Sequence, residues 1–549
     1  MASPFASKLG TNYCPSAEEM VEIETLLVEP ELRLKRLDEA IIEMQKALDK
    51  LTQERDTLGA YVHAHNALIS PARRLPLDII QEIFTACLPT HRNCVMSASE
   101  APVLLGRICS AWREISLSTP RLWASLHLAV PQIDPWIETW SKEYTSDTSE
   151  QRLEVTRTWL HRSGQCPLSI SMHSPDLAGV NTPQTSAFLQ ALIPFASRWQ
   201  RIQFNIPASF TEILGQVAAS DVPMLQSFTL YQGPRSQPHD LSWDFFGMTQ
   251  ARNISITGDN FVFSELPLRW SQLTTLSTVS PEGLAINTRI STETVLQTIS
   301  RCPQLQSFSF EHAGGSELGT QISSSIIEHP LLEKLHCVGT DLTAVIHDVL
   351  RRLVLPGLKD FTLLWIENPN SMAVQDVSPL LCFLARSLHL KCLHMETEQF
   401  STLHLQEILR SLPPTLQRLR ITAPWVYDIH GTSTDSFNDD VLAVLTPTPG
   451  LATPCPDLKV LQMDQCITIS YAAILQFITA RIATLKRIRV DFAKEIELDK
   501  RPSLRLFIES GLDVSVTHTV SPELRFSPWD GLPDAPPPPS WGSAQQSLL

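Results

Sequence analysis

Glycine and basic residues are the scarce components of this chain. Only 20 of its 549 residues are glycine, which argues against glycine-rich loops that bind phosphate groups. Neither of the two common motifs of such loops, G-x-x-x-x-G-K-S/T and G-x-G-x-x-G, occurs. The 43 Lys and Arg residues are outnumbered by 58 Asp and Glu residues, which gives a net charge of −15. A general nucleic-acid binder needs a basic surface to displace counterions, so we expect no nucleic-acid partner.

Patterns of common catalytic and metal sites are also missing. Neither G-x-S-x-G nor H-E-x-x-H occurs, so we expect no enzymatic activity of the chain's own and no cofactor. The best metal-like cluster has a spacing that matches no common zinc arrangement, and we predict no metal site from Cys382, His389, Cys392 and His394. The 11 cysteines are scattered and odd in number, which argues against a disulfide framework.

Long hydrophobic runs are missing as well. The best stretch, Leu380 to Leu393, is broken by Arg386, His389 and Lys391, and it falls short of the roughly 18 apolar residues that span a bilayer. No apolar signal core follows Met1. The chain does have 43% hydrophobic and only 18% charged residues, which supplies a large core. We therefore expect a soluble protein of the cytoplasm, the nucleus or both, with no membrane partner.

From residue 34 onward, apolar residues recur at alternating spacings of three and four. This a/d heptad pattern is typical of a helix whose narrow apolar face packs against something. Two partners remain open: a second copy of the chain, in a homodimer through residues 34–62, or the rest of the same chain. Arg55 occupies one core position, where it weakens a dimer and helps to fix its register. The apolar members are Leu34, Leu37, Ile41, Met44, Leu48, Leu51, Leu58 and Val62.

A second helical region, about residues 75–128, carries more apolar surface than its small helices can hide among themselves. It opens with Leu75-Pro76, which suits the first turn of a helix because the missing N–H of proline costs nothing there. A broad apolar face follows. A polar connection, Pro89 to Pro102, separates that face from a second apolar segment, which ends at Trp123. Apolar surface of this kind indicates a partner.

These residues resemble the F-box family. Four family elements occur in order: an opening Leu-Pro, an Ile-Ile-x-x-Ile-Phe helix at 79–84, an Ile-Cys-x-x-Trp segment at 108–112 and a closing Pro-x-Leu-Trp at 120–123. The connection at 89–102 is longer than is usual in the family and replaces part of its second helix. A coiled-coil-like helix directly before the box resembles a large group of fungal F-box proteins.

The resemblance implies docking on a Skp-type adaptor, which links an F-box chain to a cullin–RING ubiquitin ligase. Tryptophans such as Trp112 and Trp123 have the large, rigid side chains that dominate interface energetics. The adaptor contacts that the resemblance implies are Leu75, Pro76, Ile79, Ile80, Ile83, Phe84, Leu104, Leu105, Ile108, Cys109, Trp112, Leu122 and Trp123. The alternative is that these side chains form the core of an ordinary helical subdomain.

The remainder of the chain is repetitive. The template apolar-x-x-apolar-x-apolar recurs with a modal period of 26–27 residues, inside the 20–29 range of leucine-rich repeats. Helical stretches such as 405–412 and 471–482 lie between copies. Each unit therefore predicts a strand followed by a helix, and units that cannot bury an apolar face alone must stack. The copies begin at Trp199, Leu225, Ala251, Leu305, Leu332, Leu358, Leu390, Leu416, Leu458 and Leu485, with a weaker copy at Leu273.

These copies resemble leucine-rich repeats only loosely, since Cys466 alone fills the position where that family places Asn or Cys. We expect an uneven solenoid in which the side chains between the template leucines point away from the core and face a protein substrate. Its C-terminal strands carry a basic patch, which suits an acidic or phosphorylated peptide or is simply a solvated face. The candidate substrate-binding residues are Arg418, Arg420, Gln462, Asp464, Arg487 and Arg489.

The sequence thus predicts an α/β protein in which a helical N-terminal part, a long amphipathic helix plus F-box helices, precedes an irregular leucine-rich-repeat-like α/β solenoid. The F-box would bind the adaptor, and the solenoid would bring an unknown protein substrate close for ubiquitination. The alternative is an interaction scaffold that uses the coiled coil and the repeat surface without ubiquitin transfer. The expected division is 1–30 N-terminal tail, 31–70 coiled-coil-like helix, 71–130 F-box, 131–167 connecting segment, 168–515 solenoid and 516–549 Pro-rich disordered tail.

Overall fold

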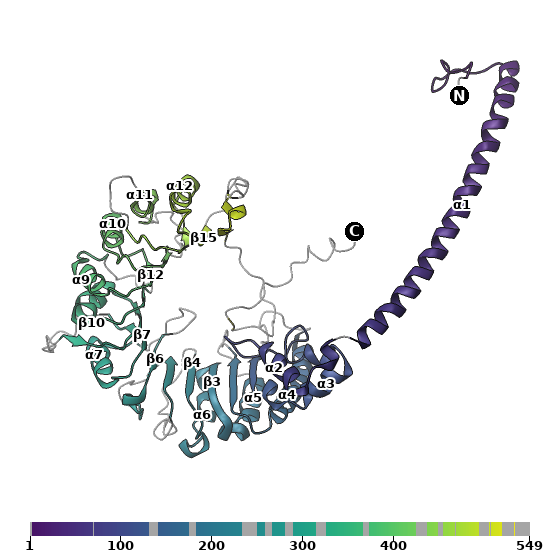
Figure 1. Ribbon diagram of the computed structural model, residues 1–549. Coiled ribbons are helices and arrows are strands. Elements are labelled where there is room, and N and C mark those ends of the chain that lie inside the picture. Colours follow the sequence, from purple (N-terminus) through teal and green to yellow (C-terminus); the bar gives the residue numbers. More distant parts are fainter. Residues whose placement is uncertain are drawn as a thin grey trace. The chain divides into compact units, whose positions relative to one another are not determined.

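The chain divides into two compact units in the computed structural model, Met1–Glu82 and Ile83–Leu549 (Figure 1). Helix α2 (Leu77–Ala86) runs across the boundary between them. The structure describes residues 3–69, 71–130, 141–174, 183–232, 250–257, 266–279, 289–314, 326–365, 373–423, 436–447, 454–466, 468–492, 504, 507–518 and 532.

The first unit is dominated by α1 (Ala17–Leu68), a helix of 52 residues. A capping box fixes its start: the Ser16 hydroxyl accepts from the Glu19 backbone N–H, and the Glu19 carboxylate accepts from the Ser16 backbone N–H. No residue of α1 is buried. A short 3-10 helix, η1 (Pro71–Arg74), separates α1 from α2. The helical N-terminal part expected from the heptad pattern is therefore confirmed.

The second unit is organised around a fourteen-stranded sheet in which all neighbouring strands are parallel. Its strands follow the order of the chain, except that β8 and β10 pair only with each other. Each new strand thus adds beside the one before it, as in a solenoid. The strands are β1 (Ser125–Ala129), β2 (Leu168–His173), β3 (Trp199–Ile206), β4 (Ser227–Gln232), β5 (Asn253–Thr257), β6 (Thr275–Ser277), β7 (Ser307–His312), β8 (Ile327–Glu328), β9 (Lys334–Gly339), β10 (Leu353–Val354), β11 (Asp360–Trp365), β12 (Cys392–Glu396), β13 (Arg418–Thr422), β14 (Val460–Cys466), β15 (Arg487–Phe492) and β16 (Asp513–His518).

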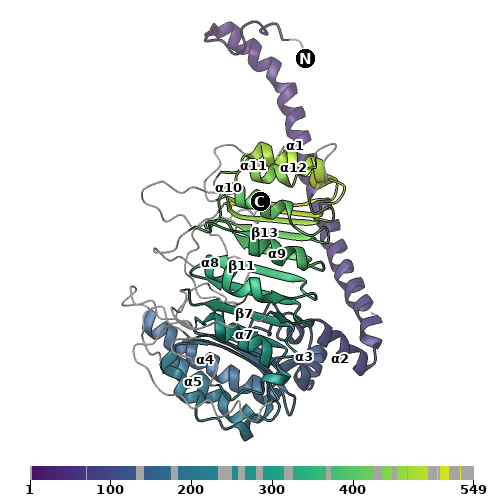
Figure 2. The same ribbon diagram turned by 90° about the vertical axis from the view of Figure 1, so that its left-hand side faces the viewer.

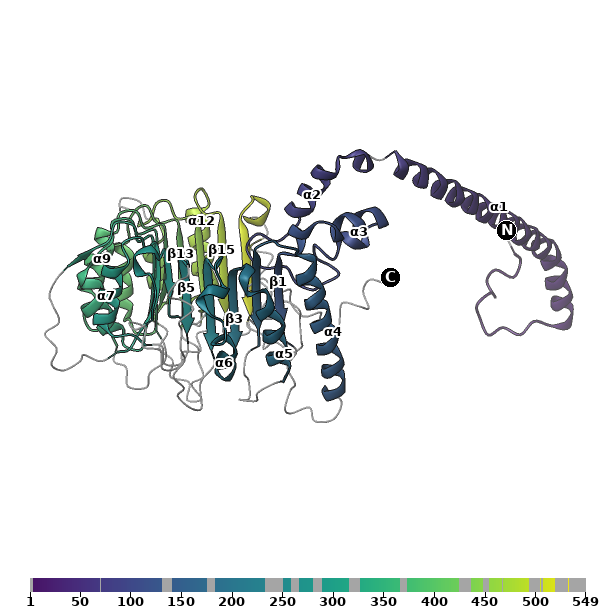
Figure 3. The ribbon, with the colours of Figure 1, turned by 90° about the horizontal axis from the view of Figure 1, so that it is seen from below.

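Helices cover one side of this sheet. In Figure 1 the strands of the second unit line the inner side of a curve and the helices its outer side, and Figure 2 shows the outer helices stacked one above another. In Figure 3 the strands run side by side. The helices are η2 (Leu105–Arg107), α3 (Ser110–Leu117), η3 (Pro120–Trp123), α4 (Ser141–Arg162), α5 (Pro183–Leu192), η4 (Ile193–Arg198), η5 (Ala208–Phe210), α6 (Thr211–Leu214), η6 (Ala219–Asp221), η9 (Trp270–Gln272), α7 (Thr292–Arg301), α8 (Leu342–Ala344), the π-helix η10 (Val345–Val349), η11 (Leu350–Arg352), α9 (Ser378–Arg386), α10 (Thr402–Arg410), α11 (Asp439–Val444) and α12 (Tyr471–Arg481).

The strands bury their template residues because side chains alternate between the two faces of a strand. In β7, Phe308 and Phe310 are fully buried, whereas Ser307 and Ser309 face the inner side. Phe308 lies in register with Leu335 of β9, so successive strands build continuous apolar rows. Each fully buried side chain of this size stabilises the fold by roughly 1.5–3 kcal/mol. All eleven predicted copies coincide with strands, and the expected α/β solenoid is confirmed in its architecture.

Three strands of the sheet, β1, β2 and β16, lie outside the predicted copies. β1 fits the template from Trp123 onward, but the sequence pattern assigns that residue to the end of the F-box. The first template position is Pro167 in β2 and Gly511 in β16, so neither strand begins with the large apolar side chain that the other copies have. The sheet therefore begins at Ser125, one strand before residue 168, where the sequence places the start of the solenoid.

The segment expected to connect the F-box to the solenoid contains α4, which packs on the first strand. The Trp159 ring meets Trp123 edge-on at 4.8 Å between ring centres, and its indole N–H donates to the Ser125 carbonyl at 3.2 Å. The Pro-rich tail predicted for 516–549 lies outside the described residues, apart from the end of β16 and Leu532.

Candidate interaction surfaces

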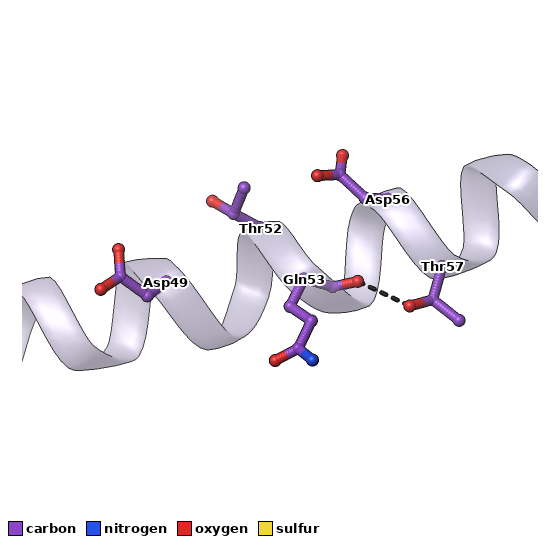
Figure 4. A pocket seen from close by; sticks show the side chains of 5 residues that line it. All are labelled: Asp49, Thr52, Gln53, Asp56 and Thr57. Atoms are coloured by element: carbon purple, nitrogen blue, oxygen red, sulfur yellow. Dashed lines mark hydrogen bonds between the residues drawn. The ribbon is translucent and has the colours of Figure 1, made fainter.

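The described part of the chain includes two shallow depressions, each on one face of a single helix. Figure 4 shows the one on α1, and the other lies on α3. On α1 the Thr57 hydroxyl donates to the Gln53 backbone carbonyl at 2.8 Å, a contact within the helix itself. A depression on one helix has no opposing wall to enclose a small molecule. The candidate surfaces are therefore those that meet another macromolecule. The side chains on α1 are Asp49, Thr52, Gln53, Asp56 and Thr57.

Helix α2 has two apolar stripes, and one of them is bare. Ile79 is 44% and Ile83 41% exposed, one turn apart on the helix, and Leu77 is exposed at its start. The neighbouring positions Ile80 and Phe84 are buried. A helix that is apolar on more than its buried side leaves a stripe for a partner. Leu75 and Pro76, just before the helix, are also exposed.

A second group of exposed apolar side chains lies at the start of α3. Leu104 and Ile108 are exposed, Ile108 at 56%. Cys109 is exposed too and is the N-cap of α3, with its sulfur accepting from the Trp112 backbone N–H at 3.5 Å. Trp112 is half-buried because its ring packs on Phe84, with 4.8 Å between ring centres. The capping role of Cys109 gives the thiol a structural function that its place in the motif does not indicate.

Five of the predicted adaptor contacts lie in the interior of this structure. Trp123 shows how they are held: its indole N–H donates to the Ser116 carbonyl at 2.8 Å, and its ring packs against Trp159. A buried side chain touches no partner without rearrangement, so these residues belong to the interior of the fold in this structure. The motif alone does not distinguish the two roles, because both need apolar residues. The five are Ile80, Phe84, Leu105, Leu122 and Trp123.

The long connection at 89–102 is held on the first strands of the sheet by Asn93. The Asn93 Oδ1 accepts from the hydroxyls of Ser125 and Ser169, at 2.9 and 2.8 Å, and its Nδ2 donates to Ser171 Oγ at 3.0 Å. The segment also forms a parallel bridge to β1. The connection therefore covers the first end of the sheet, a role that its polar composition does not reveal.

The inner face of the solenoid changes character along the chain. Its first two inward-facing positions on each strand are uncharged from β4 to β7: Ser227, Thr229, Asn253, Ser255, Thr275, Ser277, Ser307 and Ser309. From β9 onward charged side chains appear at the same positions: Lys334, Asp360, Arg418, Arg420, Arg487, Arg489 and Asp513. A ligand that is recognised by charge would therefore contact the later strands.

The basic patch predicted on those strands is partly neutralised by neighbouring carboxylates. Arg420 Nε lies 2.6 Å from Asp464 Oδ2 of the next strand. The side-chain amide of Gln462 donates to the same carboxylate at 3.0 Å. The structure thus brings these three predicted substrate residues together, but they bind one another.

A second arginine of the patch is paired in the same way. Arg487 pairs with Asp513 of β16, a strand that the sequence template did not predict. Within the described residues, Arg418 and Arg489 have no ion-pair partner, and both are exposed. The basic character of this face therefore comes from Arg418 and Arg489.

Three half-buried titratable side chains lie on strands β9 and β12, ahead of the arginines of β13. Burial lowers the pKa of His336 to about 4, and burial with the nearby Arg420 charge lowers the pKa of His394 to about 3. Burial raises the pKa of Glu396 to about 7, although its carboxylate accepts from the Trp365 backbone N–H at 2.8 Å. At neutral pH the two imidazoles are uncharged and add nothing to the positive patch.

The described part of the chain contains no group of three or more His, Cys, Asp and Glu side chains placed to hold a metal ion. In the cluster considered from the sequence, Cys382 lies on α9 and is exposed, while Cys392 and His394 lie on β12. The His394 Nε2 is 2.9 Å from the Thr422 hydroxyl, so this ring is engaged in a hydrogen bond. No helix among the described residues is both long enough and apolar enough to cross a membrane.

Comparison with known proteins finds only distant similarities to solved structures. No protein-family model matches the chain, and no curated protein matches it. Among solved structures, the leucine-rich repeat-containing protein LegL7 from Legionella pneumophila aligns at 12% identity over 71% of this chain and 91% of its own, with a TM-score of 0.25. A TM-score this low adds nothing to the fold that the strands themselves display. The likeness of residues 75–123 to the F-box therefore rests on the motif.

Proposed function

We propose that this chain is the substrate-recruiting F-box subunit of a Skp–cullin–F-box type ubiquitin ligase. The observation that carries the proposal is the bare apolar stripe of α2, together with the exposed apolar side chains before α3, at the spacing of the F-box motif. Covering such surface with a partner is favourable because it removes apolar area from water. The proposed adaptor contacts are Leu75, Pro76, Leu77, Ile79, Ile83, Leu104, Ile108, Cys109 and the half-buried Trp112.

The solenoid would provide the second contact, with a protein substrate. Repeat folds of this kind offer a long inner face whose side chains vary without disturbing the core. The charged later strands favour an acidic or phosphorylated segment, because guanidinium groups bind carboxylate and phosphate oxygens in a bidentate manner. Arg418 and Arg489 are the side chains proposed to make that contact.

The role in ubiquitination would be one of proximity. A chain that holds the adaptor at one site and the substrate at another makes no bond itself, but raises the concentration of substrate beside the ubiquitin-conjugating enzyme. This mechanism requires no catalytic residue in the chain.

Binding of purified full-length chain to a Skp-type adaptor tests the proposal. The variant Ile83→Asp/Ile108→Asp places two charges on the bare surface, and we expect adaptor affinity to fall by about a hundredfold or more. Both side chains are exposed in the free chain, so the variant should fold. The matched control is Leu388→Asp/Leu403→Asp, which changes two exposed leucines of the solenoid and should bind normally. No binding by the native chain, or equal binding by both variants, would refute the proposal.

Ubiquitin transfer separates the ligase subunit from an interaction scaffold. A ligase subunit should support ubiquitination of a bound protein when adaptor, cullin, RING protein and conjugating enzyme are supplied, and the Ile83→Asp/Ile108→Asp variant should not. If the adaptor binds but proteins held by the solenoid are never modified or shortened in lifetime, the scaffold is the correct function.

A further inference from the structure

Helix α1 exposes its apolar side chains along its whole length. None of its 52 residues is buried, although the helix includes many leucine, isoleucine, valine and methionine residues. Helices in water are stabilised mainly by packing an apolar face, and propensity alone is marginal. The exposed apolar side chains and the length of the helix therefore indicate that α1 packs against a partner.

Most of these exposed side chains form one seam, while Val21, Leu26, Val28, Leu32 and Ile42 lie outside it. The a/d heptad of residues 34–62 continues back toward the start of the helix through Leu27, Ile23 and Met20, interrupted at Pro30. At 1.5 Å per residue the seam from Met20 to Val62 is about 65 Å long. Its apolar members are Met20, Ile23, Leu27, Leu34, Leu37, Ile41, Met44, Leu48, Leu51, Leu58 and Val62, all strongly exposed except Ile23, which is half-exposed.

We propose that α1 pairs with α1 of a second copy of this chain as a parallel, in-register coiled coil. The first argument is the strict 3.5-residue average of the seam, which keeps it facing an identical helix over many turns. A helix packed on a globular surface needs a wider stripe, of three to four apolar positions in two turns. The α1 seam is narrower, with two apolar positions in every two turns.

The charges that flank the seam favour the parallel orientation. In a parallel pair, the g position of one helix, just before an a residue, lies close to the e position of the other helix, just after the following d residue. Here Arg33 of one copy would meet Asp38 of the other, an attractive pair that occurs twice by symmetry. Along the middle of the seam the flanking residues are the uncharged Ala40, Gln45, Ala47 and Thr52, so no like charges oppose one another there.

Arg55 fixes the register of the pair. In an in-register parallel coil the two Arg55 side chains lie at the same level, and Glu54 of each copy flanks Arg55 of the other. Within one chain Arg55 Nη2 already lies 2.6 Å from Asp56 Oδ1. The positive charge of each Arg55 is thus balanced by carboxylates at this one register. A shift of one helix along the other would place that charge against a leucine. A single polar core position of this type selects register and a two-helix state.

The mass of the full-length protein in solution tests the pairing. Sedimentation equilibrium or light scattering should give twice the 61.4 kDa of one chain. Leu37→Lys/Leu51→Lys should raise the dimer dissociation constant by about a hundredfold or more, because it buries unpaired charges in the seam. The matched control is Val21→Lys/Ile42→Lys, which changes two exposed side chains outside the seam and should remain dimeric. A monomer at all concentrations, or equal dissociation of both variants, would overturn the proposal.

Orientation is tested by cross-linking. In the parallel register Met44 faces its own copy, so Met44→Cys should give a disulfide-linked dimer above the background of the native cysteines, while Ile42→Cys should not. Arg33→Glu and Asp38→Arg should each weaken the dimer by about threefold to tenfold, and the two together should restore it. Dimers without the Met44→Cys cross-link would contradict the parallel register. The pairing does not depend on the proposed ligase function, since a chain that binds no adaptor can still form it.

Discussion

Replacing Arg481 with methionine should destabilise the C-terminal repeats selectively. The side chain, on α12, is only 3% exposed, and its guanidinium makes four hydrogen bonds to backbone carbonyls. Nε and Nη2 donate to Leu445 at 2.9 and 2.8 Å, Nη1 to Cys455 at 2.6 Å and Nη2 to Pro454 at 2.6 Å. Leu445 ends α11, and Cys455 holds a left-handed turn (φ 48°) before β14. Arg481 thus joins three elements across a long interval between strands.

The magnitude follows from the carbonyls that methionine leaves without donors. A buried acceptor that loses its partner costs about 1–3 kcal/mol, and three carbonyls are affected here. Burial of the guanidinium also lowers its pKa, so removing the charge recovers part of that loss. We expect a net loss of about 2–4 kcal/mol in the stability of this region.

Hydrogen exchange of the native chain and the variant measures this effect locally. In α11, β14 and α12, protected amides should exchange about 30- to 700-fold faster, which is that free energy at 1.4 kcal/mol per tenfold. Amides of β3 to β7 should not change, because a repeat contacts only its neighbours. Arg410→Met, on the surface of α10, is the matched control and should exchange as the native chain does. Unchanged exchange near Arg481, or an equal increase along the whole sheet, would refute the reasoning.

Three further predictions concern stability. Phe84→Ala should cost about 3–5 kcal/mol in urea unfolding because the ring is fully buried, whereas Ile108→Ala, at an exposed position, should cost under about 1 kcal/mol. Similar losses would contradict the placement of Phe84 in the interior and Ile108 on the surface. Asn93→Ala should cost about 2–3 kcal/mol and speed proteolysis near the first strands, since it removes three hydrogen bonds; unchanged proteolysis would contradict its role. Burial lowers the folded-state pKa of His336 to about 4, so its contribution to the free energy of unfolding is present above about pH 6.5 and is lost as the pH falls toward 4. His336→Gln should therefore reduce the pH dependence of the free energy of unfolding over that range. An unaltered pH dependence would contradict this role.

The repeats could be predicted from sequence because their signal is regular. Two apolar side chains per strand at fixed spacing are required wherever a strand packs on a helix, so Phe308 and Phe310 indicate both the strand and its buried face. The pattern fails where another residue replaces the first apolar position, as Gly511 does before β16. Because that strand is not predicted, neither is the pairing of its Asp513 with Arg487.

The interaction surfaces were less predictable, for a different reason. Burial and binding both select apolar residues, so the motif assigns Ile83 and Phe84 the same role although only Ile83 is exposed. Single contacts made by polar side chains leave no periodic signal in the sequence. The Asn93 bridge to three serines and the Arg481 bonds to three carbonyls are of this kind, since each depends on segments far away in the sequence.

Hydrogen exchange of the full-length chain with and without a Skp-type adaptor would locate the adaptor contact. We expect protection of the amides in α2 and in residues 104–112 when the adaptor is added, with the strands of the solenoid unchanged. Protection confined to the solenoid, or none at adaptor concentrations well above those of known F-box binding, would contradict the claim that the bare stripe of α2 is where the adaptor docks.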